Sequence, residues 1–204
     1  MSTKPRSTYH HGDLRQSLID SAIALINEAG VSDLSLRQVA RRIGVSHNAP
    51  YRHFQDKEAL LAAVAEEGFK ALTLAMETAQ QETRSDAAAA LTAIGKAYVR
   101  FALAHPAHYR VMFSEFRSNF HDYPSLVAAG QQSFMILVST IKTGQAAEIF
   151  KAADSWEMAH VAWSLVHGQA LLILDHRIPA ASEAKLEEFL QFSCQLLISG
   201  MASV

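Results

Sequence analysis

The segment from Leu36 to Phe54 constrains the fold most, because it holds two short helical patterns with almost nothing between them. Ser35 is a good N-cap for the first helix, and Gly44 ends it where a left-handed backbone is needed. Ser46 then opens a second short helix with Pro50 in its first turn, where a missing N–H costs least. Because the connection between these two helices is so short, we expect them to cross at a steep angle. The apolar positions of the first helix follow at i, i+3, i+4 and i+7: Leu36, Val39, Ala40 and Ile43.

The rest of the chain also shows helical periodicity, and no strand pattern is found. The first helix begins near Asp13 and ends before Gly30. Asp56, Asp154 and Ser182 are expected to cap later helices. The sequence therefore predicts an all-α fold, with further helices over 56–78, 86–105, 106–116, 124–143, 154–176 and 182–200.

Composition and charge favour a folded, soluble protein with a basic N-terminal part. Half of the 204 residues are hydrophobic and 19% are charged, which argues against a disordered polymer. Residues 1–57 carry eight Lys and Arg against five Asp and Glu, a net +3, and the remaining ten against fifteen give −5. A basic N-terminal part joined to an acidic remainder is typical of a polyanion-binding module with a regulatory domain. The alternative is that the excess of three positive charges arises by chance.

Targeting and membrane segments are not expected. The N-terminus lacks the apolar stretch of a signal peptide, and the longest uncharged run, Tyr123 to Ile141, contains Pro124, glutamines and serines. The lone Cys194 fits a reducing compartment. The protein is therefore predicted to be cytoplasmic, with no membrane association.

The polar face of the Leu36–Phe54 segment suits nucleic acid. Asn and Gln side chains can bond adenine in two places, Arg can do so with guanine, and Tyr and His can donate to phosphates. Lys57 lies in the first turn of the next helix, whose N-terminal dipole also favours phosphate. The alternative is that these side chains are only the solvated faces of short helices. The face comprises Arg37, Gln38, Arg41, Arg42, His47, Asn48, Tyr51, Arg52 and His53.

Residues 12–72 resemble the DNA-binding domain of the TetR family of bacterial transcription regulators. The resemblance rests on the run from Leu36 to Ser46, then Tyr51-Arg52-His53-Phe54, then Asp56 to Leu61. One departure is Pro50, where many relatives have Leu or a β-branched residue. The resemblance implies base contacts from Arg37, Gln38, His47, Asn48 and Ala49, and phosphate contacts from Ser35, Tyr51, Arg52, His53 and Lys57.

The resemblance also implies an architecture and a mode of action. About nine helices are expected, with residues 73–204 forming a C-terminal helical bundle for regulation and dimerisation. The implied protein is a homodimer that represses transcription from double-stranded operator DNA and is released by a small-molecule effector, with no cofactor. Two recognition helices of a dimer can read half-sites about 34–36 Å apart.

The second domain offers a candidate effector site. The run from Ala162 to Gly168 resembles the Trp-His-Gly subclass of these regulators, and Trp156, His160, Trp163 and His167 form one helical stripe. Such a stripe can line a cavity, with Trp stacking on an effector and His bonding to it, or can be plain core. The same alternatives hold for the other candidate walls: Phe101, Met112, Phe113, Phe116, Phe134 and Met135.

Dimerisation is assigned to the last two predicted helices, which the family pairs as a four-helix bundle. Their apolar residues are Leu165, Leu172, Leu186, Phe189, Leu190, Leu196 and Leu197.

Other functions find less support in the sequence. Glu157-x-x-His160 matches one element of a di-iron carboxylate bundle, but that chemistry needs a second copy, which the sequence lacks. Phosphate-binding loops and nucleophile motifs are also absent from the sequence, so an enzyme is not expected. A metal- or haem-sensing regulator and a non-specific, nucleoid-type DNA binder remain as alternatives.

Overall fold

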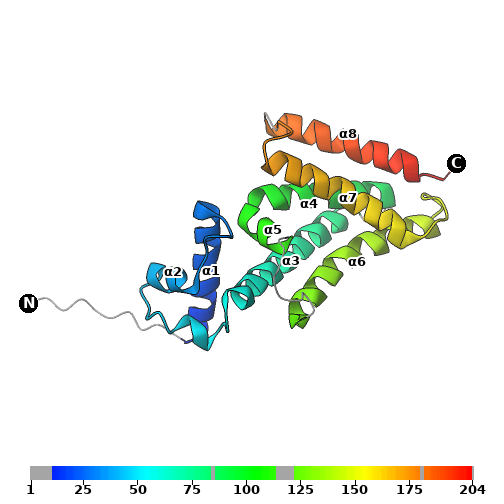
Figure 1. Ribbon diagram of the computed structural model, residues 1–204. Coiled ribbons are helices and arrows are strands. Elements are labelled where there is room, and N and C mark those ends of the chain that lie inside the picture. The colour runs from blue at the N-terminus through cyan, green and yellow to red at the C-terminus, as the bar shows by residue number, and fades with distance from the viewer. Residues whose placement is uncertain (1–10, 84–85, 114–121, 180–181, 204) are drawn as a thin grey trace, which may run out of the picture.

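The computed structural model describes residues 11–83, 86–113, 122–179 and 182–203. Over these residues the chain forms eight α-helices and one short 3-10 helix, η1, and no β-sheet, which confirms the predicted fold class (Figure 1). The elements are α1 (His11–Ala29), α2 (Leu36–Arg42), η1 (Pro50–Arg52), α3 (Lys57–Gln81), α4 (Ala87–Ala104), α5 (Pro106–Met112), α6 (Pro124–Ala146), α7 (Ser155–Leu174) and α8 (Glu183–Met201).

Side-chain caps fix the starts of several helices, as the sequence predicts. The Ser35 hydroxyl accepts from the backbone N–H of Gln38, and Asp56 accepts from that of Ala59 at 2.8 Å. Asp154 and Ser182 cap α7 and α8 in the same way. These bonds satisfy N–H groups that have no partner inside the helix.

The second helix of the Leu36–Phe54 segment differs from the prediction. Gly44 has φ +72°, as expected, but the only regular element between it and α3 is η1, which spans Pro50–Arg52. Two hydrogen bonds, from Ala49 N–H to Ser46 O (2.9 Å) and from His53 N–H to Pro50 O (2.9 Å), join residues that are three apart in the sequence. In an α-helix the bonded residues are four apart. Pro50 has no N–H to donate to Ser46, so the α-helical ladder cannot pass through it. The predicted α-helix is therefore replaced by tight turns.

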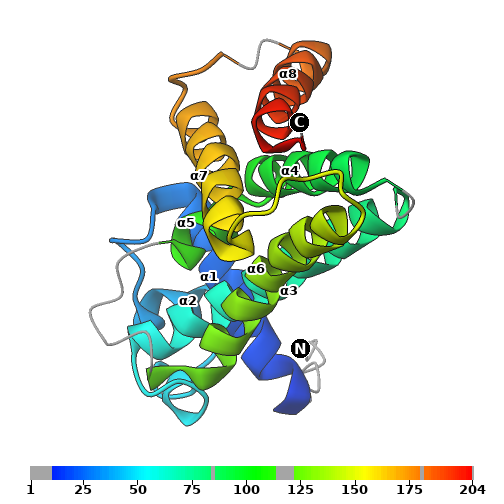
Figure 2. The ribbon, with the colours of Figure 1, turned by 90° about the vertical axis from the view of Figure 1, so that its right-hand side faces the viewer.

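Helix α3 connects the two halves of the molecule. The N-terminal unit, consisting of α1, α2 and η1, lies at one end of α3, and helices α4 to α8 lie along and beyond its other end (Figures 1 and 2). Near its start α3 buries Leu60 and Val64, and further along it buries Leu72 and Met76. The predicted domain boundary after residue 72 therefore falls inside one continuous helix.

Helix α4 lies at the centre of the C-terminal half, in contact with α3, α5, α6, α7 and α8. It is the one helix in the described residues that is long and apolar enough to cross a membrane. Half of its residues, including Leu91, Ile94 and Tyr98, are buried by its neighbours. Its apolar character is thus explained by its position in the core of the bundle.

Candidate functional site

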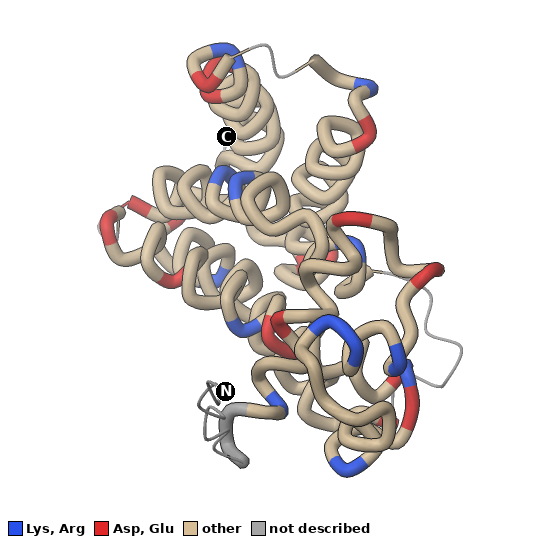
Figure 3. The backbone as a smooth tube through the Cα atoms, turned by 90° about the vertical axis from the view of Figure 1, so that its left-hand side faces the viewer, with Lys and Arg blue, Asp and Glu red and all other residues tan. Residues whose placement is uncertain are grey.

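The exposed side chains of the N-terminal unit gather the groups that the sequence assigns to DNA. Arg37, His47, Asn48, Tyr51 and Arg52 are all exposed around α2, the following turn and η1. Figure 3 looks onto this end of the molecule and shows Lys and Arg residues along its helices and turns, with acidic residues between them. Arginine, amide and imidazole groups together can bond both base edges and phosphate oxygens.

A buried underside supports this surface. Leu36, Val39 and Ala40 of α2 are buried, and so is Phe54 after η1. Pro50 is buried as well, so it fills an apolar position even though it interrupts the helix. Because this face is turned inward, the polar residues between these positions point outward.

The remaining predicted contacts are partly buried. Gln38 is half-buried, and its side-chain oxygen accepts a 2.7 Å hydrogen bond from the Ser35 hydroxyl. Ala49 and His53 are also half-buried. Ser35 and Gln38 thus restrain each other through a reciprocal pair of bonds at the start of α2.

Lys57 is held by the backbone of the loop between α1 and α2. Its Nζ donates to the carbonyl oxygens of Val31 and Ser32 at 2.8 and 2.9 Å. This ammonium therefore ties the loop to the first turn of α3. The predicted phosphate contact would have to share the same ammonium group.

Two other cations of this unit hold its helices together. Arg42 forms a bidentate ion pair with Glu28 of α1, with both N–O distances 2.7 Å, and the hydrogen bonds lower the pKa of Glu28. The guanidinium of Arg15 lies 5.4 Å from the centre of the Phe54 ring, as a cation–π contact. Both contacts fix the orientation of α1 against the rest of the unit.

The C-terminal half contains a large cavity, hereafter the cavity, of about 710 Å³, bounded by α3, α4, α5, α6 and α7. This volume lies within the range of about 300–1,000 Å³ that is typical of small-molecule sites. Six aromatic side chains line the cavity: Phe69, Tyr98, Phe113, Phe134, Trp156 and Trp163. Among its described lining residues there is no Lys, Arg, Asp or Glu.

Most of the predicted wall residues meet at this cavity. Met112, Phe113, Phe134, Met135 and Trp163 line it, as do Trp156 and His160 of the predicted stripe. The Phe134 ring lies between those two, with its centroid 5.6 Å from Trp156 and 4.9 Å from His160.

Two predicted wall residues lie elsewhere, and the position of a third is not described. Phe101 is buried beside the His105 ring, 4.9 Å away, and does not line the cavity, because it faces the junction of α4 and α5. His167 lies behind Phe113 and Trp163, at 4.5 and 5.4 Å between ring centroids. Phe116 is outside the described residues.

Tyr98, Tyr109, His167 and Trp163 form a compact hydrogen-bonded group at one wall, hereafter the hydroxyl cluster. Nδ1 of His167 lies 2.7 Å from the Tyr109 hydroxyl oxygen and 2.9 Å from that of Tyr98. The two hydroxyl oxygens are 3.3 Å apart, and Trp163 Nε1 donates to Tyr98 at 3.2 Å. The sequence analysis missed both tyrosines. The sequence does offer one signal that could have identified them: each is a Tyr within the apolar stripe of a core helix. A buried phenol of this kind needs a polar partner.

Burial keeps the hydroxyl cluster uncharged at neutral pH. It raises the pKa of Tyr98 to about 12 and shifts the pKa of Tyr109 upward as well. It lowers the pKa of His167 from 6.5, because loss of water disfavours the imidazolium form. At neutral pH the cluster therefore offers hydroxyl donors and a neutral imidazole.

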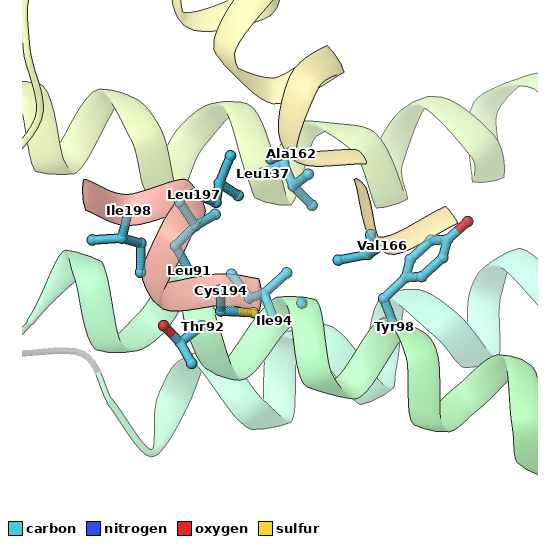
Figure 4. Close-up of a pocket in the computed structure, with 11 residues that line it drawn as sticks. Leu91, Thr92, Ile94, Tyr98, Leu137, Ala162, Val166, Cys194, Leu197 and Ile198 are labelled. Carbon is cyan, nitrogen blue, oxygen red and sulfur yellow. The ribbon is translucent and has the colours of Figure 1, made fainter. Parts of the chain in front are cut away.

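A second, much smaller cavity of about 20 Å³ lies between α4, α6, α7 and α8 (Figure 4). Leu91, Val166 and Cys194 are among its mostly apolar lining residues, and burial raises the pKa of the Cys194 thiol. Figure 4 shows the Tyr98 hydroxyl pointing away from this space. The space is about the size of one water molecule, so it is too small for an organic ligand.

Both halves of this chain match known protein families. The family described as "Bacterial regulatory proteins, tetR family" matches residues 18–64, and "Tetracyclin repressor-like, C-terminal domain" matches residues 91–197. The uncharacterised HTH-type transcriptional regulator YobS of Bacillus subtilis is 24% identical over 190 residues, which are 93% of each chain. Tetracycline repressor class C of Escherichia coli is 44% identical over 52 residues, 26% of this chain and 24% of that one.

Solved structures have the same fold. A protein of unknown function from Rhodococcus sp. RHA1 is 37% identical, with a TM-score of 0.85 over 97% of this chain and all of that one. FadR of Bacillus subtilis, solved in complex with stearoyl-CoA, is 20% identical with a TM-score of 0.75, over 91% of this chain and 98% of that one. Because the C-terminal family match alone covers more than half of the residues, the chain belongs to the TetR family of helix-turn-helix transcription regulators and is not an enzyme.

Proposed function

We propose that the protein is a cytoplasmic homodimeric repressor that binds a two-part operator and leaves it when a small molecule occupies the cavity. The observation that carries the proposal is the exposed group of Arg37, His47, Asn48, Tyr51 and Arg52 above a buried apolar underside. Residues 12–72 serve as the DNA-binding domain and residues 73–204 as the regulatory and dimerisation domain.

The base contacts come from Arg37, Gln38, His47, Asn48 and Ala49, on α2 and the turn after it. Ser35, Tyr51, Arg52, His53 and Lys57 contact phosphates. Asn48 is exposed on the turn that the Ala49 N–H to Ser46 O hydrogen bond closes, which supports its place among the base contacts. Lys57 contributes to phosphate binding while it holds the preceding loop.

The dimer forms through α7 and α8. Val161, Leu171 and Leu172 on α7 are 38–59% exposed, and Phe192 and Leu196 on α8 are 59% and 61% exposed. Exposed apolar helix faces of this kind are typical of protein interfaces. The charged contacts of Lys96 and Arg100 with Glu187 hold α8 on α4, so the face is fixed in place.

Gly168 adds support for this interface. A Cβ atom built at Gly168 meets no other atom within 4 Å, so packing inside the protomer does not require glycine there. Glycine inside a helix costs about 1 kcal/mol relative to alanine. A partner helix that approaches closely explains this residue, and it gives the glycine of the Trp-His-Gly motif a role. We accordingly assign the chain to the Trp-His-Gly subclass.

The cavity is the effector site. FadR was solved with stearoyl-CoA, a ligand with a long apolar chain. The cavity of this chain is lined by aromatic and aliphatic groups, which suits an apolar molecule or part of one. The effector must bind the DNA-incompetent form of the dimer more tightly, since equal affinity for both forms would move no equilibrium.

Selection of bound fragments from a random DNA library tests operator recognition. We expect a two-part palindromic site, and competition by unrelated duplex should be at least about a thousandfold weaker at physiological salt. If unrelated duplex competed equally, the protein would be a nucleoid-type binder. A thermal-shift screen of small molecules, followed by operator release, tests the effector role separately.

A further inference from the structure

The described residues that line the cavity carry no fixed charge. The described lining residues are aromatic or aliphatic, apart from Gln131, Ser133 and His160, and Tyr98 is the one tyrosine among them. The Ser133 hydroxyl already donates to the carbonyl oxygen of Gly130 at 2.8 Å. An ionised ligand group buried against these described residues would lose its water without gaining a counter-charge from them, which is costly. The lining therefore favours an uncharged ligand.

The hydroxyl cluster provides the main polar contact on the buried side. Gln131 and His160 are exposed, whereas Tyr98, a residue of α4, is only 4% exposed. Tyr98 accepts from Trp163 Nε1, so one of its lone pairs is already used. What it can offer a ligand depends on where its own hydroxyl hydrogen is directed.

Counting hydrogens shows that one of the two tyrosine hydroxyls must use the long contact between them whenever Nδ1 of His167 accepts from the other. A neutral imidazole with its hydrogen on Nε2 has a single lone pair on Nδ1, and the shorter contact, 2.7 Å, is with Tyr109. Once Tyr109 donates there, Tyr98 can donate only to the Tyr109 oxygen at 3.3 Å, which is long for an O–H···O bond. With the hydrogen on Nδ1 instead, the three groups hold one hydrogen too many for their contacts.

Of the two hydroxyls, only Tyr98 can turn to a ligand. Tyr109 is completely buried and does not line the cavity, whereas Tyr98 does. The hydroxyl of Tyr98 also points away from the small second cavity (Figure 4). An acceptor atom placed in the large cavity would thus replace a long hydrogen bond with a normal one.

We propose that the cavity takes an uncharged, largely apolar molecule that presents a hydrogen-bond acceptor, such as a ketone or ester carbonyl oxygen, to the hydroxyl of Tyr98. This assignment rests on the proposed role of the cavity as the effector site. It makes Tyr98 the residue that distinguishes a carbonyl-bearing ligand from a hydrocarbon of the same shape. The aromatic walls supply affinity, and Tyr98 supplies selectivity.

Two probes of matched shape test the proposal. Benzophenone and diphenylmethane differ in one carbonyl oxygen, and equilibrium dialysis measures the dissociation constant of each for the full-length protein. We expect benzophenone to bind about three- to tenfold more tightly, the effect of one net hydrogen bond. Tyr98→Phe should remove that preference while diphenylmethane still binds. The matched control Ser133→Ala, which removes another hydroxyl from the lining, should keep it.

A spectroscopic measurement makes the test independent of affinity. The carbonyl stretching band of bound benzophenone should lie at lower frequency in the wild type than in Tyr98→Phe. Equal affinity of the two probes, an unchanged band in Tyr98→Phe, or no binding of either probe would overturn the proposal.

Charged probes separate this inference from the proposed function. 4-Benzoylbenzoate and a trimethylammonium derivative of benzophenone should bind at least about tenfold more weakly than benzophenone, because neither finds a counter-charge among the described lining residues. If a charged probe bound more tightly and released operator DNA, the effector role of the cavity would stand and the assignment of an uncharged ligand would be wrong. Operator binding without any probe, measured on the same preparations, is unaffected by either result.

Discussion

Individual residues of the N-terminal unit divide into those that hold the unit together and those that remain outward. Arg42 is paired with Glu28, Arg15 covers Phe54, and Lys57 is bonded to two carbonyl oxygens. Asn48 is exposed on the turn before Pro50. The sequence names Arg42, Lys57 and Asn48 alike as part of a surface suited to DNA, but only their three-dimensional surroundings separate the two groups.

Asn48→Ala should change operator preference. If the amide bonds one base in two places, its loss should cost about 1–3 kcal/mol at one base step and little elsewhere. Binding to a panel of base-substituted operators measures this effect. Arg52→Ala is the matched control, since loss of a phosphate contact should weaken all duplexes alike and reduce the salt slope by about one. A uniform loss for Asn48→Ala would contradict the assignment.

Stability should decrease in mild acid because of two histidines. Burial lowers the folded-state pKa of His108 and of His167 below 6.5, so the unfolded chain takes up protons at a higher pH than the folded one. The stability these groups contribute is present above pH 6.5 and is lost as the pH falls from there through their folded pKa values. Burial raises the pKa of Glu67 above 4.5. The folded chain therefore takes up this proton at a higher pH than the unfolded chain, and Glu67 makes the protein more stable as the pH falls toward 4.5.

Urea unfolding at pH 7.5 and 5.5 tests this dependence. The double variant His108→Gln/His167→Gln should show a smaller loss of unfolding free energy between the two pH values than the wild type. The exposed His47→Gln should behave like the wild type. An identical loss in the double variant would assign the acid sensitivity to other groups.

The residues around the cavity show which contacts the sequence could predict and which it could not. Helical spacing groups Trp156, His160, Trp163 and His167 on one stripe, and three of the four line the cavity. Spacing does not reveal which neighbouring helix covers a given turn, so it could not separate Phe101 and His167 from the true walls. Tyr98 and Tyr109 come together from different helices, and such a contact leaves no local pattern in the sequence.

At the scale of helices, local chemistry predicted starts better than ends. The caps at Ser35, Asp56, Asp154 and Ser182 are confirmed, because a side chain that accepts from the first turn acts over three residues. The predicted ends of α3, α6 and α7 are displaced by two or more residues, since tertiary packing decides how far a helix continues. At Pro50 the missing donor outweighed the helical pattern of its neighbours.

The crossing of α3 and α5 should depend on Gly68. A Cβ atom there would lie 2.5 Å from Sδ of Met112 and 3.2 Å from Cβ of His108. Gly68→Ala should therefore push Met112 toward the cavity and destabilise the protein by about 1–3 kcal/mol. Denaturant unfolding measures the change.

Gly130→Ala is the control for this substitution. Its Cβ would meet only the Phe69 ring, at 3.7 Å, which is ordinary contact. In α6 this change should be neutral or stabilising by up to about 1 kcal/mol, because alanine favours a helix more than glycine does. Equal effects of the two substitutions would show that close approach of α3 and α5 is not limiting.

At the scale of the whole molecule, the exposed faces of α7 and α8 should decide the oligomeric state. Leu172→Glu and Phe192→Glu place a charge on residues that are 44% and 59% exposed, so the protomer should still fold. Sedimentation should show a monomer, and operator affinity should fall because the two half-sites are then bound separately. Leu74→Glu, at a 65% exposed residue of α3, is the control and should remain dimeric. A dimer in all three variants would place the interface elsewhere.

The continuity of α3 has a mechanical consequence. The helix rises about 1.5 Å per residue, so Lys57 lies about 18 Å along the axis from Phe69, which lines the cavity. A stiff rod pivoting by about 5° at Phe69 would carry its tip sideways by about 1.6 Å. Hydrogen bonds to base edges tolerate only a few tenths of an ångström. A rearrangement no larger than a change of side-chain rotamer inside the cavity would then suffice to misalign the far end with a DNA groove.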